Sequence, residues 1–257
     1  MTNEQETPPR HVVKDLPLTR LFPNMLTVFA LCSGLTGMRF AMQGNFEFAV
    51  LAILIAAIFD VLDGRVARML NIASKFGAEL DSLSDAISFG VAPGFIMYEW
   101  VLKDGGGLGW IAVMVFAVCC SLRLARFNTM LDNHNTPFWA KRYFTGVPAP
   151  SGAALGLLPL AFFLEFGEAA HFPPFVYSLW MLLVGGLMVS RLPTFAPKGW
   201  RIEPLWVAPL FAGSAALVAG LITNTWMTLS VAGVFYVLAI PVSWYSYHAR
   251  AKKEASL

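Results

Sequence analysis

The stretch from residue 60 to residue 85 reads DVLDGRVARMLNIASKFGAELDSLSD and contains four aspartates, Asp60, Asp63, Asp81 and Asp85. The first two are three residues apart and the last two are four apart, so each pair shares one face of a helix. A short loop joins the two helices, which makes them antiparallel neighbours and brings the acidic faces together. Facing carboxylates repel one another, and a divalent cation relieves that repulsion. Oxygen ligands predict Mg²⁺ or Mn²⁺, with Ca²⁺ as a substitute.

The other distinctive positions of this stretch are small or cationic. Gly64, Ala67 and Gly77 have little or no side chain, so a ligand can approach the backbone closely there. Arg68 adds a planar cation suited to phosphate. The stretch therefore predicts a site for a pyrophosphate with a flat ring beside it. The alternative is structural, because an aspartate such as Asp81 can cap a helix and glycines can allow tight helix packing.

The composition places this stretch in a membrane protein. Of the 257 residues, 57% are hydrophobic and 13% are charged, whereas a soluble domain has about 45–50% apolar and about 25% charged residues. The excess apolar surface must face something other than water, and lipid is the simplest candidate. The net charge of +2 gives no indication of nucleic-acid binding, and no nucleic-acid partner is expected.

The apolar stretches predict an all-α, polytopic membrane bundle of about eight transmembrane helices. A helix needs about 20 mostly apolar residues to cross a bilayer. The candidate stretches lie near 22–41, 46–64, 82–102, 108–127, 149–166, 172–190, 204–223 and 226–247. Residues 1–257 are expected to form a single domain, because no soluble domain fits between the spans, with residues 1–21 as a polar cytoplasmic lead-in.

The positions of the cations predict the orientation. Cytoplasmic loops are enriched in Lys and Arg. If the N-terminus lies inside, only Arg39 and Lys103 among the 18 Lys and Arg residues fall outside. An even number of spans with both termini in the cytoplasm is therefore expected. The aspartates would then lie at the cytoplasmic ends of their helices.

The spacing D-x2-D-G-x2-A-R-x8-G-x3-D-x3-D resembles the signature of the CDP-alcohol phosphotransferases. Every fixed position matches, and these positions are Asp60, Asp63, Gly64, Ala67, Arg68, Gly77, Asp81 and Asp85. The resemblance implies a six-helix core, here with two further spans, a site open to the cytoplasmic leaflet and a homodimer. It also implies that the first three aspartates bind metal with help from Asp85, which in addition takes the proton of the acceptor alcohol.

The resemblance further implies where a CDP-linked lipid binds. The residues expected to contact it are Asn24, Thr27, Asp63, Gly64, Ala67, Arg68 and Gly77. The first two belong to an upstream family element, P-N-x2-T, which begins at Pro23. A proline in the first turn of a helix is common, so this element is also open to a structural explanation.

Three further stretches resemble the bacterial, membrane-integrated phosphatidylserine synthases. They are SLRLARFN at 121–128, FTGVPAP at 144–150 and SRLPTF at 190–195. A serine acceptor has a carboxylate, for which an arginine is a suitable partner. The residues expected to contact serine are Arg123, Arg126, Asn128 and Arg191. Arginines at cytoplasmic helix ends also follow from the charge rule and the helix dipole, which leaves a structural explanation open.

The expected reaction is transfer of the phosphatidyl group from CDP-diacylglycerol to the hydroxyl of L-serine, with release of CMP. The resemblance implies that it takes place in a bacterial inner membrane, with the site facing the cytoplasm. Two alternatives stay open. The same chemistry can use glycerol 3-phosphate, an inositol compound or choline as the acceptor. A cation transporter also places charges inside a bundle, although its polar groups would gather at mid-membrane rather than at one end.

Overall fold

The computed structural model describes residues 22–70, 74–130, 143–195 and 204–255, so the expected lead-in at 1–21 lies outside the described residues. The described part is mainly helical, as predicted. Its elements in order are α1 (Phe22–Met42), α2 (Phe46–Met69), α3 (Lys75–Asp85), the π-helix η2 (Ala86–Val91), α4 (Ala92–Trp100), the 3-10 helix η3 (Leu102–Gly105), α5 (Gly107–Met130), β1 (Tyr143–Thr145), α6 (Ala149–Gly156), α7 (Leu158–Phe166), the 3-10 helix η5 (Gly167–Ala170), α8 (Pro174–Val189), β2 (Pro193–Phe195), α9 (Pro204–Thr223) and α10 (Thr225–Ala255).

The eight predicted spans coincide with helices, but two of them are not single regular helices. The span expected at 82–102 begins earlier, at Lys75, and runs through α3, η2 and α4. The span expected at 149–166 is divided into α6 and α7. Pro159 has no N–H to donate to the carbonyl of Leu155, and the indole N–H of Trp180 on α8 donates to that oxygen instead, at 2.8 Å.

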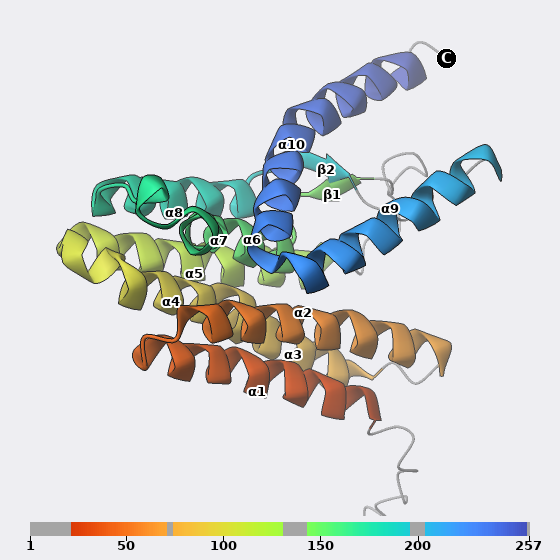
Figure 1. The fold of residues 1–257 in the computed structure, drawn as a ribbon. Helices are drawn as coiled ribbons and strands as arrows, with labels where there is room; N and C mark the ends of the chain where they lie inside the picture. Colours follow the sequence, from red (N-terminus) through yellow and green to blue (C-terminus); the bar gives the residue numbers. More distant parts are fainter. Residues whose placement is uncertain (1–21, 71–73, 131–142, 196–203, 256–257) are drawn as a thin grey trace, which may run out of the picture.

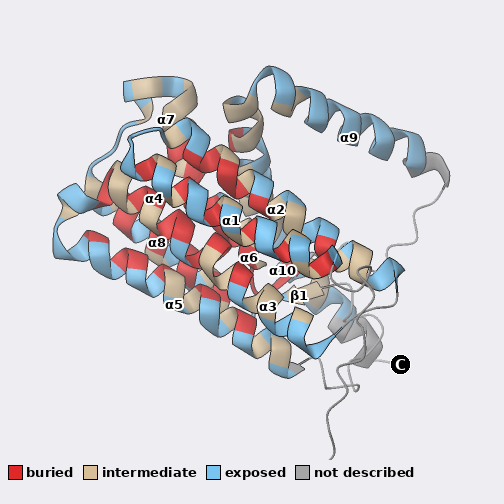
Figure 2. Ribbon diagram, turned by 90° about the horizontal axis from the view of Figure 1, so that it is seen from below, coloured by how far each residue is buried: buried red, intermediate tan, exposed pale blue. Residues whose placement is uncertain are grey.

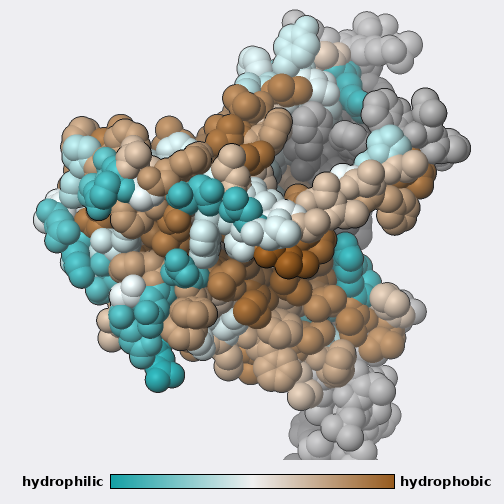
Figure 3. All heavy atoms as spheres, viewed as in Figure 1, coloured by the Kyte–Doolittle hydropathy of each residue, from teal (hydrophilic) through white to brown (hydrophobic). Residues whose placement is uncertain are grey.

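Long apolar helices identify an integral membrane protein. Four stretches of described residues are long and apolar enough to cross a bilayer, and they are Phe22–Met42, Gly107–Thr129, Ala149–Ala170 and Thr225–Arg250. The helices Pro174–Val189 and Val207–Thr223 are apolar but shorter. Figure 3 shows a broad apolar surface over α1 and α2, where large hydrophobic side chains are exposed. The number of spans and their orientation stay predictions.

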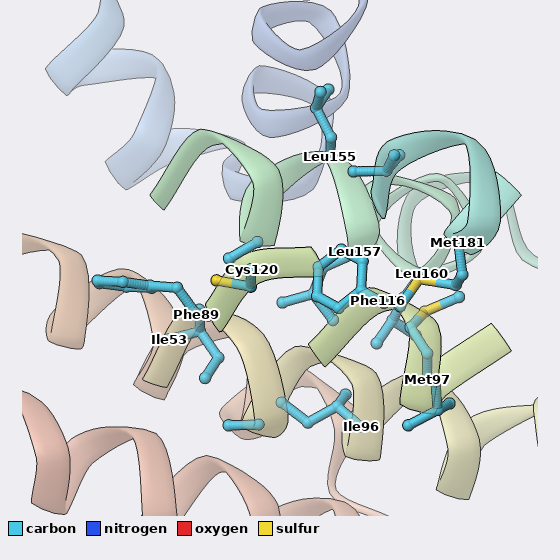
Figure 4. Close-up of a cluster of buried hydrophobic side chains, with 14 of the residues drawn as sticks. Ile53, Phe89, Ile96, Met97, Phe116, Cys120, Leu155, Leu157, Leu160 and Met181 are labelled. Atoms are coloured by element: carbon cyan, nitrogen blue, oxygen red, sulfur yellow. The ribbon is translucent and has the colours of Figure 1, made fainter. Parts of the chain in front are cut away.

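The helices pack into a layered bundle (Figure 1). The pairs α1 with α2 and α5 with α8 are the main helix contacts, and η2 and α4 lie between these pairs. Buried residues follow the inward faces of the bundle helices, whereas residues 207–219 of α9 are exposed (Figure 2). The core between the layers includes Phe89, Ile96, Phe116, Leu160 and Met181 (Figure 4), and burial of these apolar side chains holds η2 and α4 in place.

Small residues allow α1 to approach the segment that follows Asp85. A Cβ atom on Gly34 would lie 2.6 Å from Ser88 Oγ and 2.9 Å from Ser88 Cα. Ser88 Oγ donates a hydrogen bond to the carbonyl of Ala30 at 3.3 Å. The close approach of two backbones through a glycine is typical of helix packing in membranes. This contact sets the position of η2, and therefore of Asp85, relative to α1.

Replacing Gly34 with Ala is expected to lower the free energy of unfolding by about 1–3 kcal/mol, because the new methyl group overlaps Ser88 and one backbone must move. Thermal unfolding of the purified protein in detergent measures this effect. Gly186→Ala is the matched control, since no heavy atom of the described residues lies within 4 Å of a Cβ there. Equal melting temperatures for both variants would contradict the packing argument.

A short antiparallel ribbon, which the all-α prediction missed, joins the middle of the chain to α10. β1 pairs with β2 through Phe144 opposite Thr194, and Thr194 Oγ1 donates to the carbonyl of Gly146 at 2.8 Å. Tyr143 contacts α10, because its hydroxyl lies 2.9 Å from Ser246 Oγ. Gly146 has φ +79°, a conformation that favours glycine, so the backbone turns tightly there between the end of β1 and the start of α6.

Candidate active site

Aspartates of α2 and α3 come together where the two helices face each other. One carboxylate oxygen from each of Asp60, Asp63 and Asp81 lies within 4.8 Å of the other two. The carboxyl group of Asp85 is a hydrogen-bonding neighbour of Asp60. Asp63 is only 5% exposed, and the other three are partly buried. The convergence expected from the helical spacing is therefore present, while the chemical role of each aspartate stays a prediction.

The donor set of this site suits a divalent cation. It consists of carboxylate oxygens, the ligands that Mg²⁺, Mn²⁺ and Ca²⁺ prefer. The three clustered oxygens are close enough for one cation to contact them all after small side-chain rotations. Among the described residues, Arg123 and Arg68 are the cations whose charge acts on these aspartates. Because several carboxylates share a partly buried space, an added cation would reduce their mutual repulsion.

The first helix fixes one of the aspartates. Thr27 Oγ1 donates a hydrogen bond to Asp63 Oδ2 at 2.6 Å, a short bond of the kind that a carboxylate accepts. Ser84 Oγ donates to the backbone carbonyl of Thr27 at 3.1 Å, which ties α3 to the same turn of α1. Thr27 was predicted to line the nucleotide site. Its hydroxyl is bonded to Asp63, and its contact with a nucleotide stays a prediction.

Arg68 lies next to the backbone of Gly64, one turn earlier on α2. A Cβ atom on Gly64 would lie 3.5 Å from Arg68 Nη1, and no closer atom surrounds it among the described residues. The side chain of Arg68 is exposed, and Ala67 beside it is partly buried. This end of α2 therefore offers an accessible guanidinium group beside a bare stretch of backbone, which is an arrangement suited to phosphate.

The start of α3 meets the start of α1. A Cβ atom on Gly77 would lie 2.9 Å from Asn24 Oδ1 and 3.1 Å from Ser74 Oγ. Ser74 is the cap of α3, because its Oγ accepts a hydrogen bond from the N–H of Gly77 at 3.0 Å. The alternative that Asp81 caps this helix is therefore wrong, since the helix begins six residues before it at Lys75. The sequence signal for this cap was the serine three residues before Gly77.

A π-helical segment begins immediately after Asp85 and was not anticipated from the sequence. η2 covers Ala86–Val91, and its residues Ser88, Phe89 and Gly90 are buried. An extra residue in a helical turn changes the phase between the residues before and after it, and such segments are frequent at functional sites. Here the change of phase lies between α3, whose polar face carries Asp81 and Asp85, and the apolar helix α4.

Two of the predicted serine ligands make structural contacts. Arg126 donates through Nη1 to the carbonyl of Val189 at 2.8 Å and through Nη2 to those of Thr145 and Ser190, both at 3.2 Å. These bonds tie the end of α5 to the end of α8 and to the ribbon. Asn128 Nδ2 donates to Ser82 Oγ at 2.8 Å, next to Asp81. Contact of either residue with serine stays a prediction, and Ser82 was not identified from the sequence.

The other two arginines differ in their surroundings. Arg123 is partly buried on α5, and its charge acts on Asp85 and Asp60. Its Nε atom is buried and has no hydrogen-bond partner among the described residues. Arg191 is exposed in the segment before β2. The structure therefore brings Arg123 into the electrostatic environment of the aspartates, whereas Arg191 stays at the surface.

Comparison of the sequence with known protein families and relatives supports the family resemblance of these residues. Residues 20–191 match the family described as CDP-alcohol phosphatidyltransferase, and residues 205–241 match CDP-alcohol phosphatidyltransferase 2. The CDP-diacylglycerol–serine O-phosphatidyltransferase of Mycobacterium leprae (strain TN) is 35% identical over 237 residues, which cover 90% of this chain and 79% of the relative. The enzyme of the same name from Mycobacterium tuberculosis (strain ATCC 25618 / H37Rv) is 36% identical over 234 residues, or 89% of this chain and 82% of the relative.

A shorter relative of the same name, from Bacillus subtilis (strain 168), is 33% identical over 170 residues, which cover 66% of this chain and 87% of the relative. The first family match spans more than half of the chain and includes every position of the aspartate motif. The chain therefore belongs to the CDP-alcohol phosphatidyltransferase family.

Proposed function

We propose that this chain transfers the phosphatidyl group of CDP-diacylglycerol to the hydroxyl of L-serine and releases CMP. The observation that carries the proposal is the cluster of Asp60, Asp63 and Asp81 with Asp85 beside it, on facing surfaces of two helices in a member of this family. Relatives that align with about nine tenths of the chain are named for this reaction, which favours serine over other acceptors.

In the proposed reaction, the serine hydroxyl oxygen bonds to the lipid-side phosphorus of the donor. The bond from that phosphorus to the bridging oxygen breaks, and CMP leaves with the electron pair. Asp85 accepts the hydroxyl proton. It must be deprotonated for this role despite its acidic neighbours, and a bound cation would favour that form. Asp60, Asp63 and Asp81 would hold divalent cations, whose charge neutralises the pyrophosphate and stabilises the transition state.

The donor is expected to bind at the end of α2 and the start of α3. Gly64, Ala67 and Gly77 would give the nucleotide room against the backbone, and Arg68 would contact phosphate. Asn24, which adjoins Gly77, would border the same space. The acyl chains would stay in the leaflet and reach the site between helices, because α1 and α2 present apolar side chains to the surface.

The sequence and the family resemblance also predict the topology, the membrane location and the assembly of the protein. We expect eight spans in one domain, both termini in the cytoplasm and the site facing the cytoplasmic side of a bacterial inner membrane. The cations are expected to be Mg²⁺ or Mn²⁺, and the protein is expected to form a homodimer. Arg123 is the favoured partner of the serine carboxylate, because it is partly buried, its charge acts on Asp85, and its Nε has no hydrogen-bond partner within the described part of the chain.

An acceptor panel tests the proposed function. One preparation is supplied with CDP-diacylglycerol and, in turn, L-serine, glycerol 3-phosphate, myo-inositol or choline, and CMP release is followed. We expect serine to be the acceptor that supports turnover, since the partly buried Arg123 suits a carboxylate, whereas a phosphate monoester requires a denser cationic site. Turnover with another acceptor and none with serine would assign the chain to a different branch of the family.

A further inference from the structure

Thr27 is bonded to both helices that carry the aspartates. It lies on α1, which packs against α2 and α3 (Figure 1). Its hydroxyl donates to Asp63 Oδ2 on α2 at 2.6 Å, and its backbone carbonyl accepts a hydrogen bond from Ser84 Oγ on α3 at 3.1 Å. Ser84 lies between Asp81 and Asp85 along the chain. A single residue of α1 therefore connects the two acidic helices beside the cluster.

The hydroxyl proton of Thr27 goes to the carboxylate rather than to its own helix. A threonine inside a helix commonly donates to the carbonyl four residues earlier, which here is that of Pro23, at 3.2 Å. Asp63 Oδ2 is closer, at 2.6 Å, and a charged acceptor forms the shorter and stronger bond. Because a hydroxyl has one proton to donate, the bond to Asp63 takes it.

Burial makes the bond between Thr27 and Asp63 a fixed part of the site. Thr27 is 4% exposed and Asp63 is 5% exposed, so the bond is shielded from water. It restricts rotation of the Asp63 carboxyl group, which has one oxygen within 4.8 Å of an oxygen of Asp60 and of Asp81. In metal sites, a partner that orients a ligand in this way typically contributes about 10–100-fold to metal affinity.

We propose that Thr27 is a positioning residue for the divalent cation, an inference that rests on the proposed function. Its hydroxyl holds the carboxylate of Asp63 in the orientation that binds the cation together with Asp60 and Asp81. Contact of Thr27 with the nucleotide, which the family resemblance implies, is a separate role, because the hydroxyl oxygen can still accept a hydrogen bond.

Replacing Thr27 with Val removes the hydroxyl and keeps a side chain of nearly the same shape. Mn²⁺ binding to the purified protein in detergent, without donor or acceptor, is measured from the electron paramagnetic resonance signal of free Mn²⁺. We expect the dissociation constant to rise about 10–100-fold in Thr27→Val and to stay within about threefold of the wild type in Thr27→Ser, which keeps the donor. The Mn²⁺ concentration for half-maximal CMP release should rise in Thr27→Val by a similar factor.

Thr36→Val is the matched control on the same helix. Thr36 is exposed, and its hydroxyl donates to the carbonyl of Cys32 in α1 itself, so the variant should bind Mn²⁺ like the wild type. An unchanged dissociation constant in Thr27→Val, or equal losses of affinity in Thr27→Val and Thr27→Ser, would overturn the inference. A lower melting temperature of cation-free Thr27→Val with unchanged Mn²⁺ affinity would also overturn it, because the bond would then only hold the helices together.

Failure of the proposed function has a different signature. The Mn²⁺ titration contains no acceptor, so weaker Mn²⁺ binding by Thr27→Val supports the inference even if an acceptor other than serine sustains turnover. Unchanged Mn²⁺ binding by Thr27→Val overturns the inference and leaves transfer to serine standing. A wild-type protein that binds no Mn²⁺ would overturn both the inference and the metal-dependent reaction.

Discussion

Replacing Asp85 with Asn is expected to reduce turnover by about 10²–10⁴-fold, the usual contribution of a general base. Asparagine has nearly the same shape but cannot take the serine proton. Binding of CDP-diacylglycerol should be largely retained, because Asp60, Asp63 and Asp81 remain clustered without it. Initial rates of CMP release and binding of labelled donor, measured on one preparation, separate these two effects.

Glu79→Gln is the matched control for Asp85→Asn. Glu79 is an exposed acidic residue on the same helix, and it is not part of the acidic cluster. Its removal should leave the rate unchanged. Wild-type turnover in Asp85→Asn would exclude Asp85 as the base, and loss of donor binding in that variant would assign it to substrate binding instead.

Removal of divalent cations is expected to abolish CMP release and to destabilise the protein. Three clustered carboxylates, one of them only 5% exposed, would then repel one another without compensation. Cation binding at a hundred times its dissociation constant contributes about 2.7 kcal/mol to stability. Activity and thermal unfolding after chelation, and after addition of Mg²⁺ or Mn²⁺ at constant ionic strength, measure both effects.

A double variant separates binding at the cluster from general screening. In Asp63→Asn combined with Asp81→Asn, the cation should no longer raise the melting temperature. The variant without cation should also be more stable than the wild type without cation, because two of the repelling charges are gone. Full activity of a preparation shown to be free of divalent metal would contradict the metal-dependent reaction.

Helical periodicity explains why the acidic cluster was predictable from the sequence. Spacings of three and four residues are local properties, and the short connection between α2 and α3 leaves only one way for the two acidic faces to meet. The eight apolar stretches were predictable for a similar reason, because the length and composition of a spanning helix are read directly from consecutive residues.

Contacts between distant segments were not predictable. The bond from Thr27 to Asp63 joins residues 36 positions apart and depends on the rotation of α1, which composition does not determine. Arg126 donates hydrogen bonds to carbonyls 63 and 64 residues away. The ribbon beside these carbonyls consists of strands of only three residues, and the sequence did not predict it. The packing of α10 on α7 and β2 is another contact between distant segments, and the general hydrophobicity of the stretch 226–247 did not predict it.

Measurement of both products of one reaction tests the assignment of the site most directly. Purified protein is incubated with CDP-diacylglycerol, L-serine and Mn²⁺, and phosphatidylserine and CMP are quantified over time. We predict that the two products accumulate in equal molar amounts and that Asp85→Asn forms neither at a comparable rate. CMP without phosphatidylserine, or equal phosphatidylserine formation by Asp85→Asn, would contradict serine transfer at the aspartate cluster.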